Sequence, residues 1–427
     1  MYIHVVKPNE TIQSIASQYG INTQRIIIDN SLYNLPYLVI GQSLVIRIPE
    51  IVHTAQRGDT TVSIAMQYGI DEIKLLQRNP NLTQRNIINI GEQIVITYED
   101  EGVQPIETYG YVYPYVRPNV LSAALPSITN CAIFGYGFRE DGSLIPINDQ
   151  PIIDSCYRYR TVPVMLLCSI GEDGNFNSEL ASVVFNSIPL QNTVIDNMIE
   201  IMKEKGYLGV DLDFEYINAD DSEAYIRFVE NVADKMHQNG FWVNVDLAPK
   251  TSSIQTGTLY EGHNYAALGE AADTVLLMTY EWGYTYGPPM AIAPLDQVRR
   301  VVEYAVTQIE NQKIYLGIPN YAYDWPLPFQ KGVTRATAFG NEAAVARAAQ
   351  FGANINFDET AQSPYYEYYA PNGSKHVVWF EDARSISGKY DLIDEFNLRG
   401  GGYWNLMNPF TQNFAYISTR YNIDKNI

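Results

Sequence analysis

The sequence predicts an α/β protein: a (β/α)8 barrel with a small α+β insertion, preceded by two copies of a βααβ module. Three observations support this prediction. The first hundred residues contain an internal repeat, strand-like and helix-like stretches then alternate to the end of the chain, and one of those strands carries acids at every second position. With 427 residues, the chain is long enough for a barrel and accessory modules.

The internal repeat consists of two units, at residues 1–48 and 50–97. Each unit is typical of a short strand, two helices and a second short strand. A threonine before the first helix suits an N-cap, and a glycine after it suits a helix end with positive φ. These positions recur 49 residues later, so that His4, Thr11 and Gly20 match His53, Thr60 and Gly69.

The second part of the chain is expected to form the barrel. Residues 98–107 are polar, acidic and interrupted by glycine and proline, so they predict a linker. The barrel domain is then expected over residues 108–427. Its eight predicted strands are 109–113, 131–138, 162–170, 206–216, 242–248, 274–280, 314–318 and 401–406.

Amphipathic stretches between the strands predict helices, the clearest at 192–205, 222–238 and 295–311. Residues 321–382 are too many for a loop between a strand and a helix, so they predict the inserted α+β lobe. A doubly wound open sheet is the alternative architecture, but the sequence offers no Gly-rich phosphate-binding loop typical of it.

One predicted strand holds three acids in alternation with apolar residues. Asp211, Asp213 and Glu215 share one face because side chains alternate along a strand. If that face points into a barrel, desolvated carboxylates repel each other, and at least one holds a proton near neutral pH. General-acid catalysis requires such a proton. The alternative is a salt-bridge cluster lining the barrel.

The composition indicates which kinds of ligand and partner the protein can bind. The formal charge of −20 repels phosphate backbones, so no nucleic acid is expected, and the 33 tyrosines suit carbohydrate. The five histidines and three cysteines lack metal-ligand spacing, so no metal or cofactor is expected, and Cys131 and Cys168 predict buried thiols. No apolar run could span a membrane, the N-terminus does not resemble a signal peptide, and a monomer is expected.

Three predicted strand ends carry a recognisable set of residues. These are Gly209, Asp211, Asp213 and Glu215 on the fourth strand, Met278-Thr279-Tyr280-Glu281-Trp282 on the sixth, and Trp404 on the eighth. The set resembles the family-18 glycoside hydrolases, the chitinases and their relatives, from about residue 109 to the C-terminus. Two positions depart from the family pattern: Leu208 replaces an aspartate, and Glu281 replaces the aspartate that contacts sugar.

The resemblance implies a retaining, substrate-assisted hydrolysis. It implies that Glu215 protonates the glycosidic oxygen, that Asp213 orients the acetamido group of the sugar, and that Asp211 shares a proton with Asp213. Tyr280 is expected to hydrogen-bond the acetamido oxygen. The residues expected to bind sugar are Trp404, Met278, Glu281, Trp282 and Asn320. Further candidates, which either line the cleft or cap helices and turns, are Glu172, Asp173, Asp324 and Trp325.

The N-terminal repeat resembles the LysM module, which binds N-acetylglucosamine-containing glycans such as peptidoglycan and chitin. The second copy carries Gly58-Asp59-Thr60 and Asn79-Pro80, where the first has Asn9-Glu10-Thr11 and Asn30-Ser31. Structural modules without a ligand are the other interpretation.

Two LysM modules followed by a family-18 barrel resemble the bacterial spore cortex-lytic N-acetylglucosaminidases. This resemblance implies cleavage after N-acetylglucosamine in spore cortex peptidoglycan fragments during germination, and a location in the spore. Two alternatives stay open: a chitinase, and a non-catalytic wall-binding protein of the spore coat.

Overall fold

The computed structural model describes residues 1–83, 85, 87–171, 174–425 and 427. Eight parallel strands in this part of the chain close into a barrel, in which the last strand pairs with the first. The predicted (β/α)8 barrel is therefore confirmed. In order of pairing, the strands are β5 (Pro105–Val112), β6 (Asn130–Phe138), β8 (Val162–Cys168), β9 (Gly209–Asp213), β10 (Trp242–Leu247), β11 (Thr274–Leu277), β12 (Ile314–Pro319) and β18 (Gly400–Trp404).

Helices surround the barrel because each carries an apolar stripe that packs on the strands. In α9, Tyr225, Phe228, Val232 and Met236 recur at helical spacing and are all buried. The helices around the barrel are α5 (Pro118–Ala124), α6 (Gln150–Arg158), α7 (Ser178–Phe185), α8 (Ile188–Lys205), α9 (Ser222–Gln238), α10 (Tyr265–Ala271), α11 (Leu295–Ala305), α13 (Ala383–Glu395) and α14 (Thr411–Arg420).

Two predicted helices have different ends in the structure. Helix α8 begins at Ile188 because Pro189 occupies its first turn, where a missing N–H is tolerated. Helix α11 ends at Ala305, and the hydroxyl of Thr307 donates to the carbonyl oxygen of Tyr304 (2.6 Å). That side-chain bond competes with further helical hydrogen bonding.

The barrel has an apolar layer outside and a mixed layer inside. On β9, Val210 and Leu212 are fully buried in the outer layer, between the strands and the helices. Inside the barrel, Tyr109, Tyr111 and Tyr315 are buried, and each hydroxyl has a hydrogen-bond partner. A tyrosine ring fills space while its hydroxyl satisfies a carboxylate, so the interior can hold acids.

A small antiparallel lobe is inserted between β12 and β18. Its five strands pair in the order β14, β13, β17, β16, β15, and α12 (Asn341–Phe351) packs on β16. The predicted α+β insertion is confirmed as part of the fold. Its strands are β13 (Ala322–Leu327), β14 (Thr337–Phe339), β15 (Asn356–Asp358), β16 (Ser363–Tyr369) and β17 (Lys375–Trp379).

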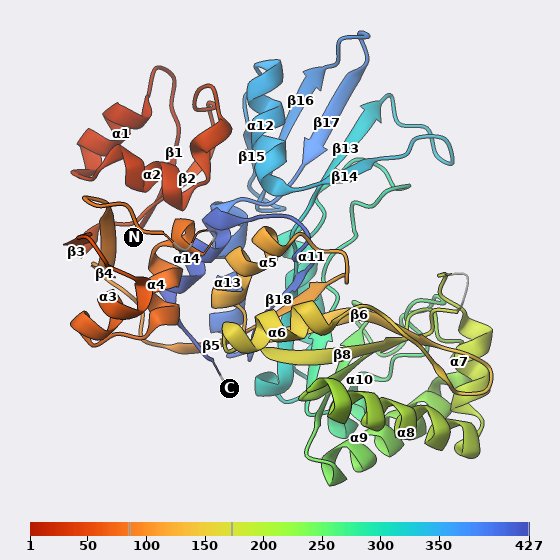
Figure 1. Ribbon diagram of the computed structural model, residues 1–427. Coiled ribbons are helices and arrows are strands. Elements are labelled where there is room, and N and C mark those ends of the chain that lie inside the picture. Colours follow the sequence, from red (N-terminus) through yellow and green to blue (C-terminus); the bar gives the residue numbers. More distant parts are fainter. Residues whose placement is uncertain (84, 86, 172–173, 426) are drawn as a thin grey trace.

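Two βααβ modules precede the barrel and lie beside it, next to α14 (Figure 1, red and orange). Thr11 and Thr60 cap the first helix of each module, and Gly20 and Gly69 end it with φ of +67° and +64°, as the sequence predicts. The module elements are β1 (Tyr2–Val5), α1 (Ile12–Tyr19), α2 (Thr23–Asp29) and β2 (Ser43–Ile46), then β3 (Pro49–Thr54), α3 (Thr61–Tyr68), α4 (Glu72–Arg78) and β4 (Gln93–Tyr98).

The first module keeps the internal contacts of the second in spite of its different sequence. Glu10 accepts hydrogen bonds from the ring of His4 (2.9 Å) and from the backbone of Lys7 (2.7 Å). Asp59 accepts the corresponding bonds, including one from the ring of His53 (2.8 Å). Glutamate therefore replaces aspartate at this turn without loss of either bond.

The segment between the second module and the barrel is docked rather than extended in solvent. Only residues 99–104 separate β4 from β5, so the first barrel strand takes up the end of the predicted linker. Glu101 pairs with Arg78 (2.5 Å), and the N–H of Gly102 donates to the carbonyl oxygen of Thr419 (2.8 Å). One acid of the predicted linker therefore serves an ion pair.

Candidate active site

The fourth barrel strand places two acids inside the barrel and a third just beyond it. Strand β9 ends at Asp213, and the chain turns at Tyr216, which has a φ of +56°. Asp211 and Asp213 are buried, whereas Glu215 is half-buried on the loop after the strand. The predicted strand 206–216 is therefore too long, because a loop rather than the strand carries Glu215 to the barrel mouth.

Asp211 is well supported by hydrogen bonds. The hydroxyl of Tyr109 donates to Oδ2 (2.8 Å), and the amide of Asn244 donates to Oδ1 (2.9 Å). Burial raises the pKa of Asp211 to about 6, although these bonds favour the ionised form and act against the rise.

Asp213 lacks comparable support. Its Oδ1 is buried and has no hydrogen-bond partner among the residues that the structure describes. Burial, and then the charges of Glu215 and Asp211, raises the pKa of Asp213 well above its usual range. A buried carboxyl in this state is suited to hold a proton or to accept a hydrogen bond from a bound molecule.

Glu215 has the proton affinity of a general acid. Burial raises its pKa to about 7, and the charge of Glu281 adds to this effect. Glu281 is fixed by hydrogen bonds from the hydroxyls of Tyr321 (2.5 Å) and Tyr323 (3.1 Å). An acid with this pKa can donate a proton near neutral pH and take it back in a later step.

The structure adds a fourth acid that sequence reasoning missed, Asp246 on β10. It is 3% exposed, and its Oδ1 accepts hydrogen bonds from the hydroxyl of Tyr111 (2.6 Å) and the amide of Asn244 (3.2 Å). Asn244 thus joins Asp246 to Asp211. Burial and the charges of Asp211 and Asp213 raise the pKa of Asp246 well above its usual range. The signal was present in the sequence, since β10 alternates polar and apolar residues as β9 does.

Tyr280 and Met278 follow β11 into the same region. Burial, and then the charges of Asp246 and Asp213, raises the pKa of Tyr280 well above 10, so its hydroxyl is a hydrogen-bond donor at neutral pH. The ring passes close to Gly317 of β12: a Cβ there would lie 2.9 Å from Cε1 of Tyr280. Met278 is buried among the barrel-interior side chains.

Trp404 ends β18 inside a cluster of aromatic rings. Its indole centroid lies 5.5 Å from the rings of Tyr111 and Phe134 and 5.9 Å from that of Tyr113. The indole keeps part of its surface exposed, so it offers a flat apolar face of the kind on which sugar rings stack.

The other expected site residues separate into two groups. Trp282 is half-buried next to Glu281 on the rim. Asn320 is 1% exposed, and its amide donates to the carbonyl oxygens of Asn405 (2.8 Å) and Asn408 (2.9 Å), so it holds the loop after Trp404.

Two of the remaining cleft candidates belong to the inserted lobe. Asp324 and Trp325 are buried within the inserted lobe, where Asp324 pairs with Arg347 and His376. Glu172 and Asp173 lie outside the described residues.

The described part of the chain contains neither a cluster of metal-ligand side chains nor a helix that could span a membrane. Within residues 1–83, 85, 87–171, 174–425 and 427, no group of three or more His, Cys, Asp or Glu is placed to hold a metal ion. Across the same residues, no helix combines the length and apolar character needed to cross a bilayer. The expected burial of Cys131 and Cys168 is confirmed.

Comparison with known proteins identifies the family. The model of the glycosyl hydrolases family 18 matches residues 129–408. The chain belongs to this family. The LysM domain model matches residues 4–47 and 53–97, so the family 18 enzyme carries two LysM domains at its N-terminus.

Relatives of this family 18 enzyme share its whole length. The cortical fragment-lytic enzyme of Bacillus subtilis (strain 168) is 36% identical over 438 residues, covering 100% of this chain and 99% of the relative. The solved structure of the Bacillus cereus spore cortex-lytic enzyme SleL matches with a TM-score of 0.83 and 34% identity, covering 99% of both chains. The structure of SleL from Bacillus megaterium QM B1551 also matches with a TM-score of 0.83 and 34% identity, covering 100% of this chain and 99% of the other.

Proposed function

We propose that this family 18 enzyme is a spore cortex-lytic N-acetylglucosaminidase. It cleaves the glycosidic bond after N-acetylglucosamine in cortical peptidoglycan fragments, and it acts in the bacterial spore during germination. One observation carries the catalytic part of the proposal: Glu215, with a pKa of about 7, lies just beyond a strand that buries Asp211 and Asp213. Full-length similarity to cortical fragment-lytic enzymes supports the substrate.

In the first step, Glu215 protonates the glycosidic oxygen, and the bond from that oxygen to the anomeric carbon breaks with its electron pair. The carbonyl oxygen of the sugar's own acetamido group attacks the anomeric carbon and forms an oxazolinium ion. Asp213 accepts a hydrogen bond from the acetamido N–H, which matches its buried and unpartnered Oδ1. Tyr280 donates to the acetamido oxygen and orients it for attack.

In the second step, the Glu215 carboxylate takes a proton from water as the water attacks the anomeric carbon. The oxazolinium ring opens, the acetamido group is restored, and the configuration at the anomeric carbon is retained. Both steps use only side chains of the enzyme, the substrate and water. The mechanism requires an N-acetyl group on the cleaved sugar, and this limits the substrate class.

The acids inside the barrel adjust the charge on Asp213 during the two steps. Asp213 is more useful as an anion when the oxazolinium cation forms, so a proton has to be held elsewhere. Asp211, with a pKa of about 6, is adjacent along the strand, and Asn244 links it to Asp246. We assign the shared proton to this group of acids rather than to one residue.

Trp404 forms the floor of the subsite for the cleaved sugar, and Met278, Glu281 and Trp282 complete its wall. The LysM domains bind N-acetylglucosamine-containing peptidoglycan and hold the enzyme on the polymer.

The test is mass spectrometry of borohydride-reduced products after purified spore cortex is incubated with the enzyme. Wild type is expected to create new reduced N-acetylglucosamine ends, Glu215→Gln none, and Glu200→Gln, at an exposed position of α8, as many as wild type. New ends on chitin alone would make the protein a chitinase. New ends on neither polymer would make it a wall-binding protein without catalytic activity.

A further inference from the structure

A large groove lies between the two LysM domains and the barrel. It has a volume of about 1390 Å³ and adjoins a second cavity of about 310 Å³ under the inserted lobe. The two share lining residues, so they form one continuous depression. The shared residues are Ser31, Asn34, Arg117, Glu342, Asn408, Pro409 and Phe410.

The barrel part of the groove lies at the catalytic end of the barrel. Arg117 follows β5 and directly precedes α5, and Asn408 lies between β18 and α14. Both positions follow the carboxyl ends of parallel strands, and Glu215 follows β9 in the same way. The loop that contains Asn408 follows Trp404, so one short segment connects the groove to the indole proposed to form the floor of the sugar subsite.

The lining of the groove has the chemistry of a carbohydrate site. Tyr33 is 56% exposed and offers a ring for stacking, and Arg117 is an exposed cation in a chain of formal charge −20. Side-chain amides can pair with hydroxyl and acetamido groups through both a donor and an acceptor. The amides that line the groove are Asn22, Gln24, Asn34, Asn81, Asn89, Gln93, Asn119 and Asn408.

Two buried polar atoms in this lining lack partners. The Nε of Arg25 and the Oδ1 of Asn81 have no hydrogen-bond partner among the described residues, and Arg25 is only 5% exposed. Buried polar groups are nearly always paired with protein, water or a ligand. An unpaired donor and an unpaired acceptor from different LysM domains therefore suit a ligand that spans both domains.

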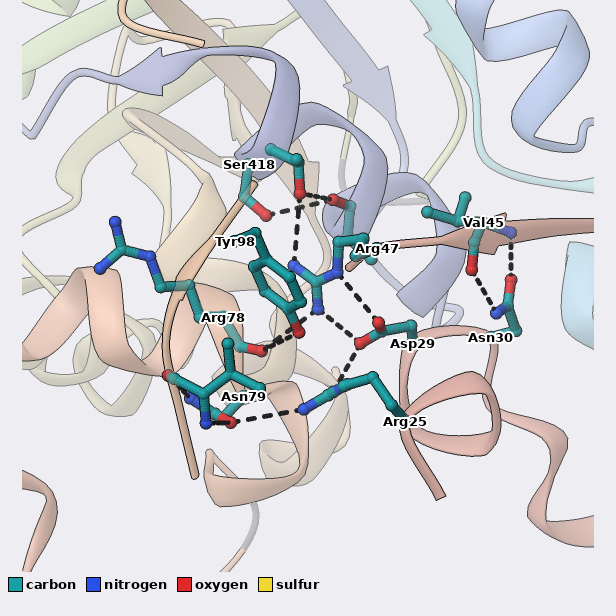
Figure 2. Close-up of polar contacts among 12 residues, drawn as sticks. Arg25, Asp29, Asn30, Val45, Arg47, Arg78, Asn79, Tyr98 and Ser418 are labelled. Atoms are coloured by element: carbon teal, nitrogen blue, oxygen red, sulfur yellow. Dashed lines mark hydrogen bonds and ion pairs between the residues drawn. The ribbon is translucent and has the colours of Figure 1, made fainter. Parts of the chain in front are cut away.

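The groove is held in a fixed shape by a buried polar network (Figure 2). Arg47 of the first LysM domain is 1% exposed and binds Asp29 through Nε (3.0 Å) and a terminal nitrogen (2.5 Å). The same guanidinium donates to the carbonyl oxygen of Arg78 in the second domain (3.2 Å) and to the hydroxyl of Thr419 in α14 (3.5 Å). Arg47 thus joins both domains to the barrel.

Further contacts attach the first LysM domain to the barrel domain. Gln412 of α14 donates to the carbonyl oxygen of Ser43 (2.8 Å), and Ile355 of the inserted lobe donates through its N–H to the carbonyl oxygen of Ile40 (2.9 Å). The domains are therefore not tethered independently, and the groove exists before a ligand binds.

We propose that this composite groove binds a peptidoglycan glycan strand along both LysM domains and the barrel rim, and guides it toward Glu215. This inference rests on the proposed function for the identity of the polymer. The barrel completes the site, so binding of a long strand depends on barrel residues as well as on the LysM domains. A short fragment that occupies only the barrel mouth does not use the groove.

The test measures binding of fluorescently labelled cortical glycan strands, long strands and tetrasaccharides separately, to full-length protein by fluorescence anisotropy. All proteins carry Glu215→Gln, so that strands stay intact. The groove variants are Tyr33→Ala, Arg117→Ala and the two combined. Tyr2→Ala, at a tyrosine of the first domain that is 51% exposed, and Arg300→Ala, at an exposed arginine of α11, are matched controls outside the groove.

We expect the combined variant to bind long strands about tenfold more weakly, because it loses a stacking ring and a charged donor. Binding of the tetrasaccharide and melting temperatures should not change, and neither control should weaken binding. Equal binding of long strands by the parent and the combined variant would refute binding in the groove. An equal loss of affinity in the control variants would refute it as well.

Cleavage separates this inference from the proposed function. If wild type creates no N-acetylglucosamine ends on cortex but long strands still bind through Tyr33 and Arg117, strand binding in the groove is supported and the proposed enzymatic function is refuted. If wild type cleaves cortex and the groove variants bind long strands normally, the proposed enzymatic function is supported and strand binding in the groove is refuted.

Discussion

Replacing Glu215 by glutamine tests the protonation of the proposed acid through stability as well as through turnover. Its pKa is raised from 4.5 to about 7, and one pKa unit corresponds to about 1.4 kcal/mol. Ionising Glu215 in the folded protein therefore costs about 3 kcal/mol relative to the unfolded chain. Glutamine has nearly the same shape and does not ionise, so the substitution removes this cost.

The difference in free energy of unfolding between Glu215→Gln and wild type is expected to increase as pH rises. Below pH 4.5, Glu215 is protonated in both the folded and the unfolded chain. As pH rises from 4.5 to 7, the unfolded chain releases this proton first, so the wild-type folded state loses stability. We expect the free energy of unfolding of Glu215→Gln to exceed that of wild type by about 1.4 kcal/mol at about pH 5.5 and by about 3 kcal/mol at about pH 8.5.

The assay is calorimetric melting at both pH values, with turnover of cortex fragments measured on the same samples. A gain of about 1 °C in melting temperature for each kcal/mol is expected for a chain of this length. Turnover should fall by about a hundredfold or more, as expected when a general acid is removed. Glu200→Gln should change neither quantity. If the Glu215→Gln advantage were the same at both pH values, or absent, Glu215 would not be a carboxyl held protonated, and the reasoning would be refuted.

Two other substitutions examine the interior acids and the docked LysM domains. Asp246→Asn keeps the acceptor for Tyr111 and imitates a protonated acid, so cleavage at about pH 5.5 should stay within about threefold of wild type; a hundredfold loss would mean that the ionised form is required. Arg47→Met removes one partner of a buried ion pair and should lower the free energy of unfolding by about 3–5 kcal/mol, measured by urea unfolding, and expose residues 99–104 to proteolysis. An unchanged proteolysis pattern and stability would contradict a docking role for this arginine.

Much of the fold could be predicted because it depends on local patterns. The capping threonines Thr11 and Thr60 and the repeat around them define two small modules without tertiary information. The alternation of strands and amphipathic helices predicts the barrel, because few other folds accommodate eight such units. The acids Asp211 and Asp213 could be assigned to the interior because a strand that is apolar on one face must direct the other face to water or to a site.

The features that the sequence could not show are contacts between segments that are distant in the sequence. Asn320 follows a strand end, and the sequence could not show that its amide donates to carbonyl oxygens of the loop after β18. Asp246 was missed because the polar side chains of β10 could not be assigned to the site until β10 is known to lie next to β9. The ion pair that docks the predicted linker 98–107 could not be inferred from the sequence, because the arginine that pairs with Glu101 belongs to another segment.

The site is electrostatically unfavourable, and the rest of the molecule has to offset that cost. Asp211, Asp213, Glu215 and Asp246 all have raised pKa values, so each weakens the folded state as pH rises through its pKa. A small domain with a marginal core could not hold four such carboxyls. The barrel can, because tyrosine hydroxyls satisfy two of the acids and an apolar layer surrounds the strands on the outside. The docked LysM domains add buried contacts to the same body. The raised pKa values of the interior acids and the extent of the folded core are therefore linked, and variants that neutralise an interior acid should tolerate loss of a docking contact better than wild type does.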